Sequence, residues 1–199
     1  MKTQELLRQY REKETSFLEL KKAAEATLSN HLEKQRIKCE NLYGRIKGFN
    51  SFLEKAQDKK MSEPFKEMTD IVGLRVICLF QSDVDKVKKV IRETFQVVKE
   101  DDKVTITRKD IFNYTTTHFD VRLLNFPNDE LSQMVFEIQV RTICQHAWCS
   151  VSHLFYKGEK SIEGIDENIE RDFYAINGLF YVADTHFEMI NQKTTTKTE

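Results

Sequence analysis

The spacing of hydrophobic and polar residues changes from helical to strand-like as the chain leaves its N-terminal part. Residues 3–53 are rich in Glu, Lys, Leu and Ala and contain no Pro, so they are predicted to form helix, interrupted at Gly44 and Gly48. Ser62–Pro64 then form a helix-start signature. The segment Leu74–Phe80 is an almost continuous apolar run with β-branched residues, which is typical of an interior strand.

Helix and strand signals then alternate towards the C-terminus. Helices are expected at 84–95, 143–156 and 167–191, and strands at 95–98, 104–107, 118–124 and 135–142. Asn125, Pro127 and Asp129 give the connection before the last strand a turn-like character, so the last two long strands are predicted to pair antiparallel. The pattern therefore predicts an α/β fold in which helices flank a mixed sheet.

The length of 199 residues is that of one domain. We expect a single domain over residues 1–199, with its core at about 40–160, a helical N-terminal extension at 1–39 and a C-terminal helix at 165–192. No apolar stretch resembles a signal peptide or a membrane span, which favours a cytoplasmic protein without membrane contact.

Composition narrows the class of function. Hydrophobic residues make up 40% and aromatic residues 11% of the chain, which argues against disorder. The 31 basic and 32 acidic residues nearly cancel, so a uniformly basic nucleic-acid binder is not indicated, although a local basic cleft remains open. The four cysteines form no CxxC pair, and Cys78 lies in an apolar run, where a buried free thiol is the ordinary interpretation.

The expected strand Phe136–Thr142 (FEIQVRT) carries the clearest chemical signal. Because side chains alternate along a strand, Glu137, Gln139 and Arg141 point to one face. A carboxylate, an amide and a guanidinium in one row can bind a phosphate that carries a metal ion. A half-buried strand with one solvated face gives the same pattern, so both interpretations stay open.

Asp70 stands directly before the other strong strand. Asp is poor strand material, so it either caps a turn or acts at the sheet edge. Close to Glu137 in space, Asp70 would complete a two-carboxylate magnesium site.

A basic group with one hydroxyl lies upstream, at Arg45, Lys47, Ser51 and Lys55. On a helix, the spacing of four residues would place the last three along one side. Such a side is either an ordinary solvated face or a site for phosphates.

Two further groups of residues have a weaker signal. Asn113–His118 (NYTTTH) brackets three threonines with a Tyr and a His, which suits base stacking and phosphate contact or plain strand packing. His146, Cys149 and His153 resemble zinc ligands, but on a helix the two histidines lie about 10 Å apart along the axis, too far for one tetrahedral ion with Cys149 between them. Cys149 and His153 could form a nucleophile pair by spacing, but no oxyanion loop accompanies them.

Four segments in this order resemble the synthetase domain of the RelA/SpoT family, in particular the small alarmone synthetases. The segments are Gly44–Lys55 (GRIKGFNSFLEK), Asp70–Arg75 (DIVGLR), Tyr114–His118 (YTTTH) and Phe136–Trp148, which contains FEIQVRT and QHAW. The resemblance implies a nucleotidyltransferase-like mixed sheet. It also implies transfer of the β,γ-pyrophosphate of ATP to the 3′-hydroxyl of GDP or GTP, with Mg²⁺ as cofactor and (p)ppGpp and AMP as products.

The resemblance further implies a role for each matching residue. Arg45 and Arg75 would hold the adenine, and Lys47, Ser51 and Lys55 would contact the ATP phosphates. Asp70 and Glu137 would bind Mg²⁺, and Glu137 would also take the proton of the acceptor hydroxyl. Tyr114 would stack on the acceptor base, and the acceptor side would be lined by His118, Gln139, Arg141 and His146. Small relatives form homo-oligomers, often tetramers, so a homo-oligomer is expected here.

The acceptor segment departs from the family pattern. The family usually has Gly before the stacking Tyr and Ser two residues after it, whereas this chain has Asn113 and Thr116. A Lys/Pro/Asn run is replaced by Arg108–Phe112 (RKDIF). An adenine nucleotide or the 3′ end of tRNA therefore remains an alternative acceptor, although the balanced charge disfavours tRNA. A non-catalytic nucleotide-binding module is the other alternative, against which the presence of both Asp70 and Glu137 argues.

Overall fold

The computed structural model describes residues 3–104, 115–156 and 167–195. Its helices are α1 (Thr3–Lys34), α2 (Phe49–Asp58), α3 (Pro64–Glu67), α4 (Gln81–Thr94), α5 (Asp129–Gln133), α6 (Ile143–Tyr156) and α7 (Glu167–Thr195). Its strands are β1 (Asn41–Ile46), β2 (Val72–Cys78), β3 (Phe95–Val104), β4 (Thr115–Leu123) and β5 (Phe136–Thr142). Within these ranges, no helix is both long and apolar enough to span a bilayer.

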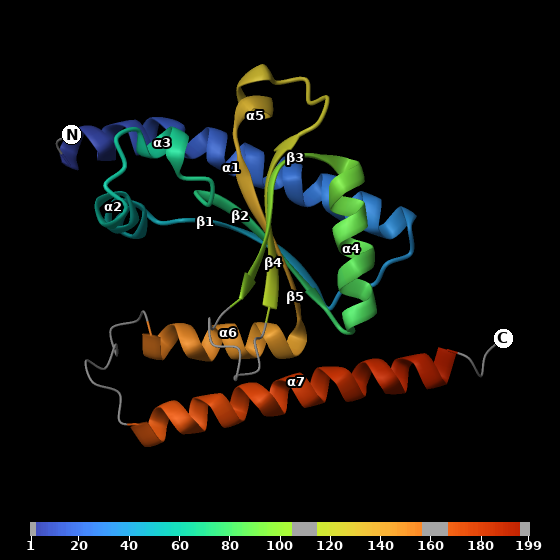
Figure 1. Ribbon diagram of the computed structural model, residues 1–199. Helices are drawn as coiled ribbons and strands as arrows, with labels where there is room; N and C mark the ends of the chain where they lie inside the picture. The colour runs from blue at the N-terminus through green and yellow to red at the C-terminus, as the bar shows by residue number, and fades with distance from the viewer. Residues whose placement is uncertain (1–2, 105–114, 157–166, 196–199) are drawn as a thin grey trace.

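The five strands form one mixed sheet in the order β1-β2-β5-β4-β3 (Figure 1). β5 pairs parallel with β2 and antiparallel with β4, which confirms the expected antiparallel pairing of the last two long strands. β5 is therefore the central strand, and all seven of its residues are buried. The α/β fold with a mixed sheet flanked by helices is confirmed.

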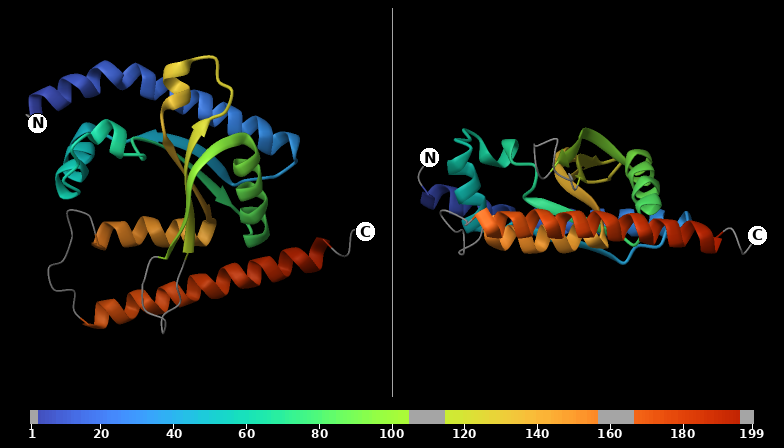
Figure 2. Two further views of the ribbon diagram at one scale, coloured as in Figure 1. Left: turned by 45° about the horizontal axis from the view of Figure 1, so that its top comes forward. Right: turned by 60° about the horizontal axis from the view of Figure 1, so that its bottom comes forward.

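One face of the sheet is apolar and is covered by helices. Side chains of the sheet such as Leu74, Ile138 and Phe119 pack there in the main hydrophobic cluster, together with Leu20 of α1 and Val87 of α4. Figures 1 and 2 show α1 running along the sheet and α4 beside it. Burying this face against two amphipathic helices leaves the opposite face of the sheet for polar side chains.

The prediction of helix over residues 3–53 is wrong at 41–46, where β1 (Asn41–Ile46) lies between α1 and α2. The segment alternates, with Leu42, Gly44 and Ile46 on the apolar face, and β2 supplies an antiparallel partner along its whole length. This pairing overrides the local preference for helix. Gly44 fits because α1 passes close by: a Cβ there would lie 2.8 Å from Cγ of Lys21.

The other elements largely follow the sequence pattern. β2, α4, β5, α6 and α7 form within a few residues of their expected positions, and α3 begins at Pro64 as expected. The strands expected at 95–98 and 104–107 are instead parts of one strand, β3, with an irregularity between Val97 and Lys99, and residues 105–107 lie outside the described ranges. The short helix α5 was not predicted; its N-cap is Asn128, whose side chain accepts a hydrogen bond from the Leu131 amide at 3.2 Å.

Helices α6 and α7 lie side by side at one end of the sheet (Figures 1 and 2). Trp148 of α6 and Phe173 of α7 pack edge to face in a second, smaller hydrophobic cluster. Two carboxylates attach α7 to the rest of the fold. Asp184 accepts a hydrogen bond from the Thr142 hydroxyl at 2.6 Å, and Glu188 accepts one from the Ser82 amide at 3.0 Å.

Candidate active site

The polar face of the sheet collects side chains from four strands. The register places Tyr43 beside Arg75 and Arg45 beside Gly73 on β1 and β2. It also places Gly73 beside Glu137, and Arg75 beside Gln139. On the other side of β5, His118 is the partner of Gln139 and Asp120 is the partner of Glu137. Since cross-strand neighbours point to the same face, these residues form one continuous surface, which confirms that Glu137, Gln139 and Arg141 share a face.

One end of this surface carries two lysines that pair with Asp70, and this is called its basic end. Asp70 Oδ2 lies 3.1 Å from Lys47 Nζ and 2.8 Å from Lys55 Nζ. Burial raises the pKa of Asp70, but the hydrogen bonds and charges of Lys55 and Lys47 more than offset this, so the pKa is lowered. The other oxygen, Oδ1, is buried and has no hydrogen-bond partner among the described residues. Asp70 is therefore ionised at neutral pH, with one oxygen available as a ligand.

Helix α1 helps to fix the position of Lys47, one of these two lysines. Tyr10 donates a hydrogen bond to the carbonyl of Lys47, and the Lys47 amide donates to the carbonyl of Ile71 at 2.8 Å. Lys47 lies in the connection between β1 and α2, not on a helix with Ser51 and Lys55, so the prediction of one basic helical side is wrong. The two lysines still converge, because β1 and α2 meet beside Asp70.

Glu137 lies at the centre of the polar face and is held by two neighbours. His118 Nδ1 is in hydrogen-bond contact with Oε1 at 2.8 Å, and Gln139 Nε2 donates to Oε2. The other ring nitrogen of His118 lies 3.2 Å from the hydroxyl of Thr116. The Glu137 side chain is only 10% exposed. These contacts fix the orientation of a buried carboxylate in the middle of the sheet.

A cationic group lies towards α6. Arg75 donates to the Tyr43 hydroxyl at 2.8 Å and to Gln139 Oε1 at 3.2 Å, and its guanidinium carbon lies 5.6 Å from the centre of the Tyr43 ring. Arg141 donates to the same Gln139 oxygen at 2.8 Å. Its side chain is buried, and its Nε has no hydrogen-bond partner within the described part of the chain. Donors left unpaired in this way favour an anionic ligand.

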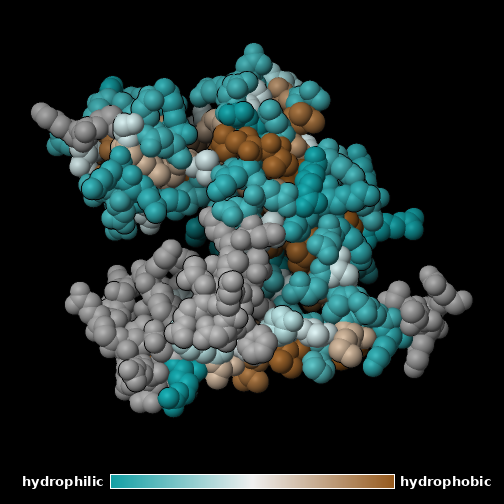
Figure 3. Space-filling model, in the orientation of Figure 1, coloured by the Kyte–Doolittle hydropathy of each residue, from teal (hydrophilic) through white to brown (hydrophobic). Residues whose placement is uncertain are grey.

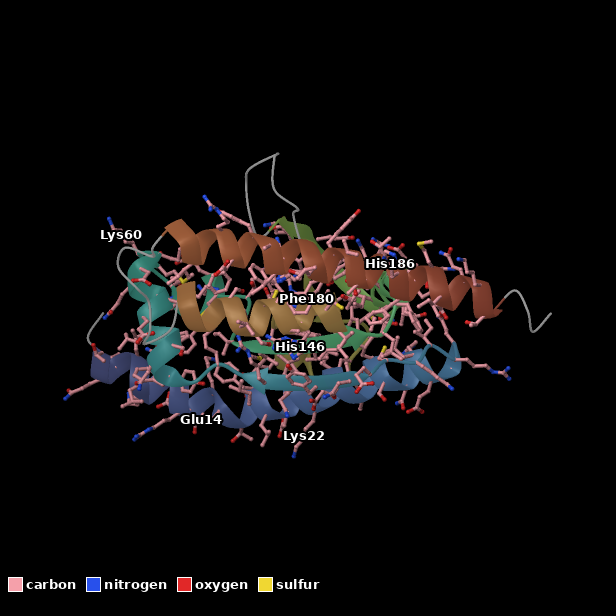
Figure 4. The ribbon with its side chains drawn as sticks, turned by 90° about the horizontal axis from the view of Figure 1, so that it is seen from below. Glu14, Lys22, Lys60, His146, Phe180 and His186 are labelled. Carbon is pink, nitrogen blue, oxygen red and sulfur yellow. The ribbon has the colours of Figure 1, made fainter. Side chains whose placement is uncertain are left out.

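His146 adjoins this cationic group. Figure 4 shows it on the side of α6 that faces the strands. Burial, followed by the positive charges of Arg75 and Arg141, lowers the pKa of His146. His146 is therefore neutral at pH 7 in the ligand-free protein, and the approach of an anion would favour its protonation.

A small depression opens on the polar face. It is lined by Tyr43, Arg45, Asp70, Gly73, Leu74, Arg75, Glu137 and Gln139. The structure therefore brings Asp70 and Glu137 together with both arginines predicted to hold adenine. Ser51 is exposed on α2. Tyr114 lies outside the described residues, so its predicted stacking role has no structural account.

Sequence reasoning missed two residues of this surface. Tyr43 supports Arg75 and lines the depression, and Asp120 is the cross-strand neighbour of Glu137. Tyr43 was hidden because its segment was assigned to helix; the alternation of NLYGRI was the available signal. Asp120 alternates with Phe119 and Val121 along its strand, but a lone carboxylate on a polar face carries no specific signal.

A comparison of the sequence with known families places this surface in context. Residues 44–161, more than half of the chain, match the region found in RelA / SpoT proteins. The chain belongs to the RelA/SpoT family. It is 30% identical over 123 residues to GTP pyrophosphokinase YwaC of Bacillus subtilis, and 32% identical over 121 residues to GTP pyrophosphokinase YjbM of the same organism. These matches cover 59% and 57% of the chain and span 58% and 55%, little more than half, of the two relatives.

Solved structures share the RelA/SpoT fold seen here. Small alarmone synthetase 1 from Bacillus subtilis superposes with a TM-score of 0.78 at 22% identity, covering 94% of this chain and 98% of that one. A GTP pyrophosphokinase family protein from Streptococcus pneumoniae gives 0.77 at 20% identity, covering 95% and 96%. The Bacillus synthetase has also been solved with its product pppGpp and with AMPCPP.

Proposed function

We propose that this protein transfers the β,γ-pyrophosphate of ATP to the 3′-hydroxyl of GDP or GTP, producing (p)ppGpp and AMP. The observation that carries the proposal is the shared depression, in which Asp70 with its two lysines and the buried Glu137 lie on one polar face. Family membership and the GTP pyrophosphokinase relatives support the same activity. Among the similar solved structures, small alarmone synthetase 1 from Bacillus subtilis binds AMPCPP, an ATP analogue, and its product pppGpp. These ligands correspond to the ATP donor and to the product proposed here.

The donor nucleotide would lie at the basic end of the surface. Lys47 and Lys55 pair with Asp70 in the ligand-free protein, and the triphosphate of ATP would compete for both ammonium groups. Ser51, exposed on the same helix as Lys55, would add a hydroxyl contact to the phosphates. Arg45 and Arg75 would hold the adenine between their guanidinium planes, as flat cationic groups can.

The residues present fit a magnesium ion. Asp70 offers a buried, unpartnered carboxylate oxygen, and Glu137 lies in the same depression. Carboxylate oxygens together with substrate phosphates are the ligands that Mg²⁺ usually takes. When bound, the ion would neutralise charge that builds up on the transferring phosphates. No larger group of His, Cys, Asp and Glu suited to a metal occurs within the described ranges, and the side chain of His153 lies outside them.

The acceptor would lie on the β4 and β5 side of the surface. Glu137 would accept the proton of the 3′-hydroxyl, while His118 and Gln139 keep its carboxylate oriented. The 3′-oxygen would attack the β-phosphorus of ATP, and AMP would leave with the electron pair of the broken P–O bond. Arg141 and His146 would hold anionic groups of the acceptor, and Tyr114 would stack on its base. Most of the acceleration would come from alignment and charge neutralisation.

The protein is also proposed to form a homo-oligomer through α7. Large apolar side chains of this helix are exposed in the single chain, among them Ile169, Ile176 and Ile190 at multiples of seven residues. Leu179 between them is 68% exposed. Figure 3 shows apolar side chains along the edge of the molecule formed by α7. Spacing by sevens is the pattern by which one helix packs along another.

The reaction is tested by offering Mg²⁺ and ATP labelled at the β- or γ-phosphate together with GDP, GTP, ATP or deacylated tRNA. We expect the label to move to GDP or GTP with an equal amount of AMP. Label on ATP or tRNA instead would replace the proposed acceptor by one of the alternatives. A protein that binds ATP but transfers nothing to any acceptor would be a binding module, and the proposed activity would be wrong.

The substitution Glu137→Gln tests the assignment of the base. Removing the carboxylate should lower kcat at least about a thousandfold, while Tm changes little, because the amide keeps the size of the side chain. Glu130→Gln, an exposed residue on α5, is the matched control and should keep full activity. Substantial transfer by a folded Glu137→Gln protein would exclude Glu137 as base and metal ligand.

A further inference from the structure

Tyr43 of β1 lies beside the two arginines that are proposed to hold the adenine of ATP. It lines the depression together with Arg45 and Arg75. The register sets Tyr43 directly opposite Arg75, and Arg75 Nη1 donates a hydrogen bond to the Tyr43 hydroxyl at 2.8 Å. We propose that Tyr43 is a positioning residue for donor binding, which holds the Arg75 guanidinium in the orientation that receives adenine. This inference rests on the proposed function and adds a residue to it.

Two neutral groups hold the guanidinium of Arg75. Nη1 donates to Tyr43, and Nε donates to Gln139 Oε1 at 3.2 Å. Among residues 3–104, 115–156 and 167–195, no carboxylate forms an ion pair with Arg75. A neutral acceptor fixes the direction of a guanidinium without cancelling its charge, whereas a carboxylate would do both. The positive charge of Arg75 therefore stays available to a ligand.

Arg75 needs Tyr43 because its other partner is shared. Arg141 donates to the same Gln139 oxygen at 2.8 Å, so two guanidinium groups meet at one atom. Like charges at such a distance repel each other, and Arg141 is the buried one of the two. A released arginine side chain also gains rotamer entropy. Without the Tyr43 hydroxyl, both effects would move Arg75 from its place, and ATP would have to restore the order when it binds.

The transfer step should not depend on Tyr43. The proposed base, Glu137, accepts a hydrogen bond from Gln139 Nε2, so its orientation follows that of the Gln139 amide. Arg141 still donates to Gln139 Oε1 when Arg75 moves, which keeps the amide in the same orientation. Loss of the Tyr43 hydroxyl should therefore weaken the binding of ATP and leave the chemical step nearly unchanged.

The substitution Tyr43→Phe tests the proposal, because it removes the hydroxyl and keeps the ring. Calorimetric titration of the full-length chain with AMPCPP and Mg²⁺, without an acceptor, measures donor binding independently of transfer. We expect the Kd of Tyr43→Phe to be about tenfold higher than that of the wild type, since a hydrogen bond to a charged group is lost. Tyr181→Phe, which changes an exposed tyrosine of α7, is the matched control and should bind as the wild type does.

A double-mutant cycle with Arg75→Met separates positioning from a general loss of structure. Arg75→Met removes the guanidinium, so the further change Tyr43→Phe should then leave the Kd for AMPCPP unchanged. With GDP as acceptor, Tyr43→Phe alone should raise the KM for ATP about tenfold, whereas kcat and the KM for GDP should change less than about twofold.

Three results would overturn the proposal. They are an unchanged Kd for AMPCPP in Tyr43→Phe, an equal loss of affinity with and without Arg75, and a lower kcat at an unchanged KM for ATP. The wild-type protein decides the proposed function separately. If it does not bind AMPCPP, the donor site is wrong and the inference falls with it. If it binds AMPCPP but transfers nothing, only the pyrophosphokinase activity is wrong, and the binding data still decide the role of Tyr43.

Discussion

Asp70 illustrates how single residues of the polar face combine stability with chemistry. Its carboxylate is partly buried, which alone would raise its pKa, yet Lys55 and Lys47 lower it. The ion pairs therefore stabilise the fold only while Asp70 is ionised. A depressed pKa means that this stabilisation is complete above the pKa of Asp in an unfolded chain, about 3.9, and disappears as the pH falls through the lower pKa of the folded state.

The substitution Asp70→Asn should reveal this contribution in the pH dependence of stability. At pH 7 the variant should be less stable by about 1 kcal/mol, because the shielded Lys47 loses its counter-ion. Below pH 4 the difference should shrink, because the unfolded wild-type chain then binds a proton at Asp70 before the folded one does, and it should vanish as the pH falls through the lower pKa of folded Asp70. Urea unfolding of both proteins from pH 3 to 7 measures this difference in stability. Asp85→Asn, an exposed residue of α4, serves as control, and a difference that stays constant down to pH 3 would contradict the ion-pair account.

The residues of the site were more predictable than the way in which they meet. The alternation in FEIQVRT was enough to place Glu137, Gln139 and Arg141 on one face. The convergence of Lys47 and Lys55 on Asp70 required the position of β1, which the helix-forming composition around it concealed. Contacts between residues distant in the chain, such as Tyr10 with Lys47, leave no trace in local spacing.

At the scale of elements, α1 passes very close to the sheet at Gly44. A Cβ there would meet Cγ of Lys21 at 2.8 Å and a carboxylate oxygen of Glu25 at 2.9 Å. The Gly44 amide also donates a hydrogen bond to that carboxylate. Helix α1 and strand β1 are thus packed as closely as a glycine allows, and α1 in turn holds Lys47 through Tyr10.

Gly44→Ala should therefore lower the free energy of unfolding by about 1–3 kcal/mol, because α1 must move or Lys21 must leave its position. It should also reduce the affinity for ATP, since α1 supports Lys47. Gly48→Ala is the matched comparison: no atom lies within 4 Å of its Cβ position, and its φ of −61° suits alanine. The change there should stay below about 0.5 kcal/mol. Equal losses of stability in both variants, measured by thermal and urea unfolding, would refute the close-approach argument.

Elements buried on both sides were the easiest to predict. β2 and β5 are interior strands, and their apolar residues identify them directly. The edge strand β1 was missed because only one side of it needs a partner, and its short alternation lies between helices. α5 has five residues, too few for a helical period to appear. The sequence thus predicts the centre of this sheet better than its edges.

At the scale of the whole molecule, the two terminal helices differ in how much of their apolar surface is buried. Helix α1 contributes side chains such as Phe17 and Leu28 to the main hydrophobic cluster, so it belongs to the body of the fold. Helix α7 buries little more than Phe173, Asn177 and Asp184 and leaves most of its large apolar side chains in solvent. An exposed apolar stripe of this length on a charged protein is typical of a surface that another chain covers.

The substitution of Leu179 and Ile190 together by Lys should abolish self-association. In the single chain these side chains are 68% and 58% exposed, so the change should cost the folded monomer less than about 0.5 kcal/mol. In an oligomer, four buried charges for every two chains would be prohibitive. Light scattering should show a multiple of the 23.5 kDa chain mass for the wild type and one chain mass for the variant. Thr185→Lys, an exposed position on another side of α7, should keep the wild-type mass. A monomeric wild type would exclude self-association. A variant that keeps the oligomeric mass would exclude α7 as the contact, because an assembly through this helix could not bury the two lysines.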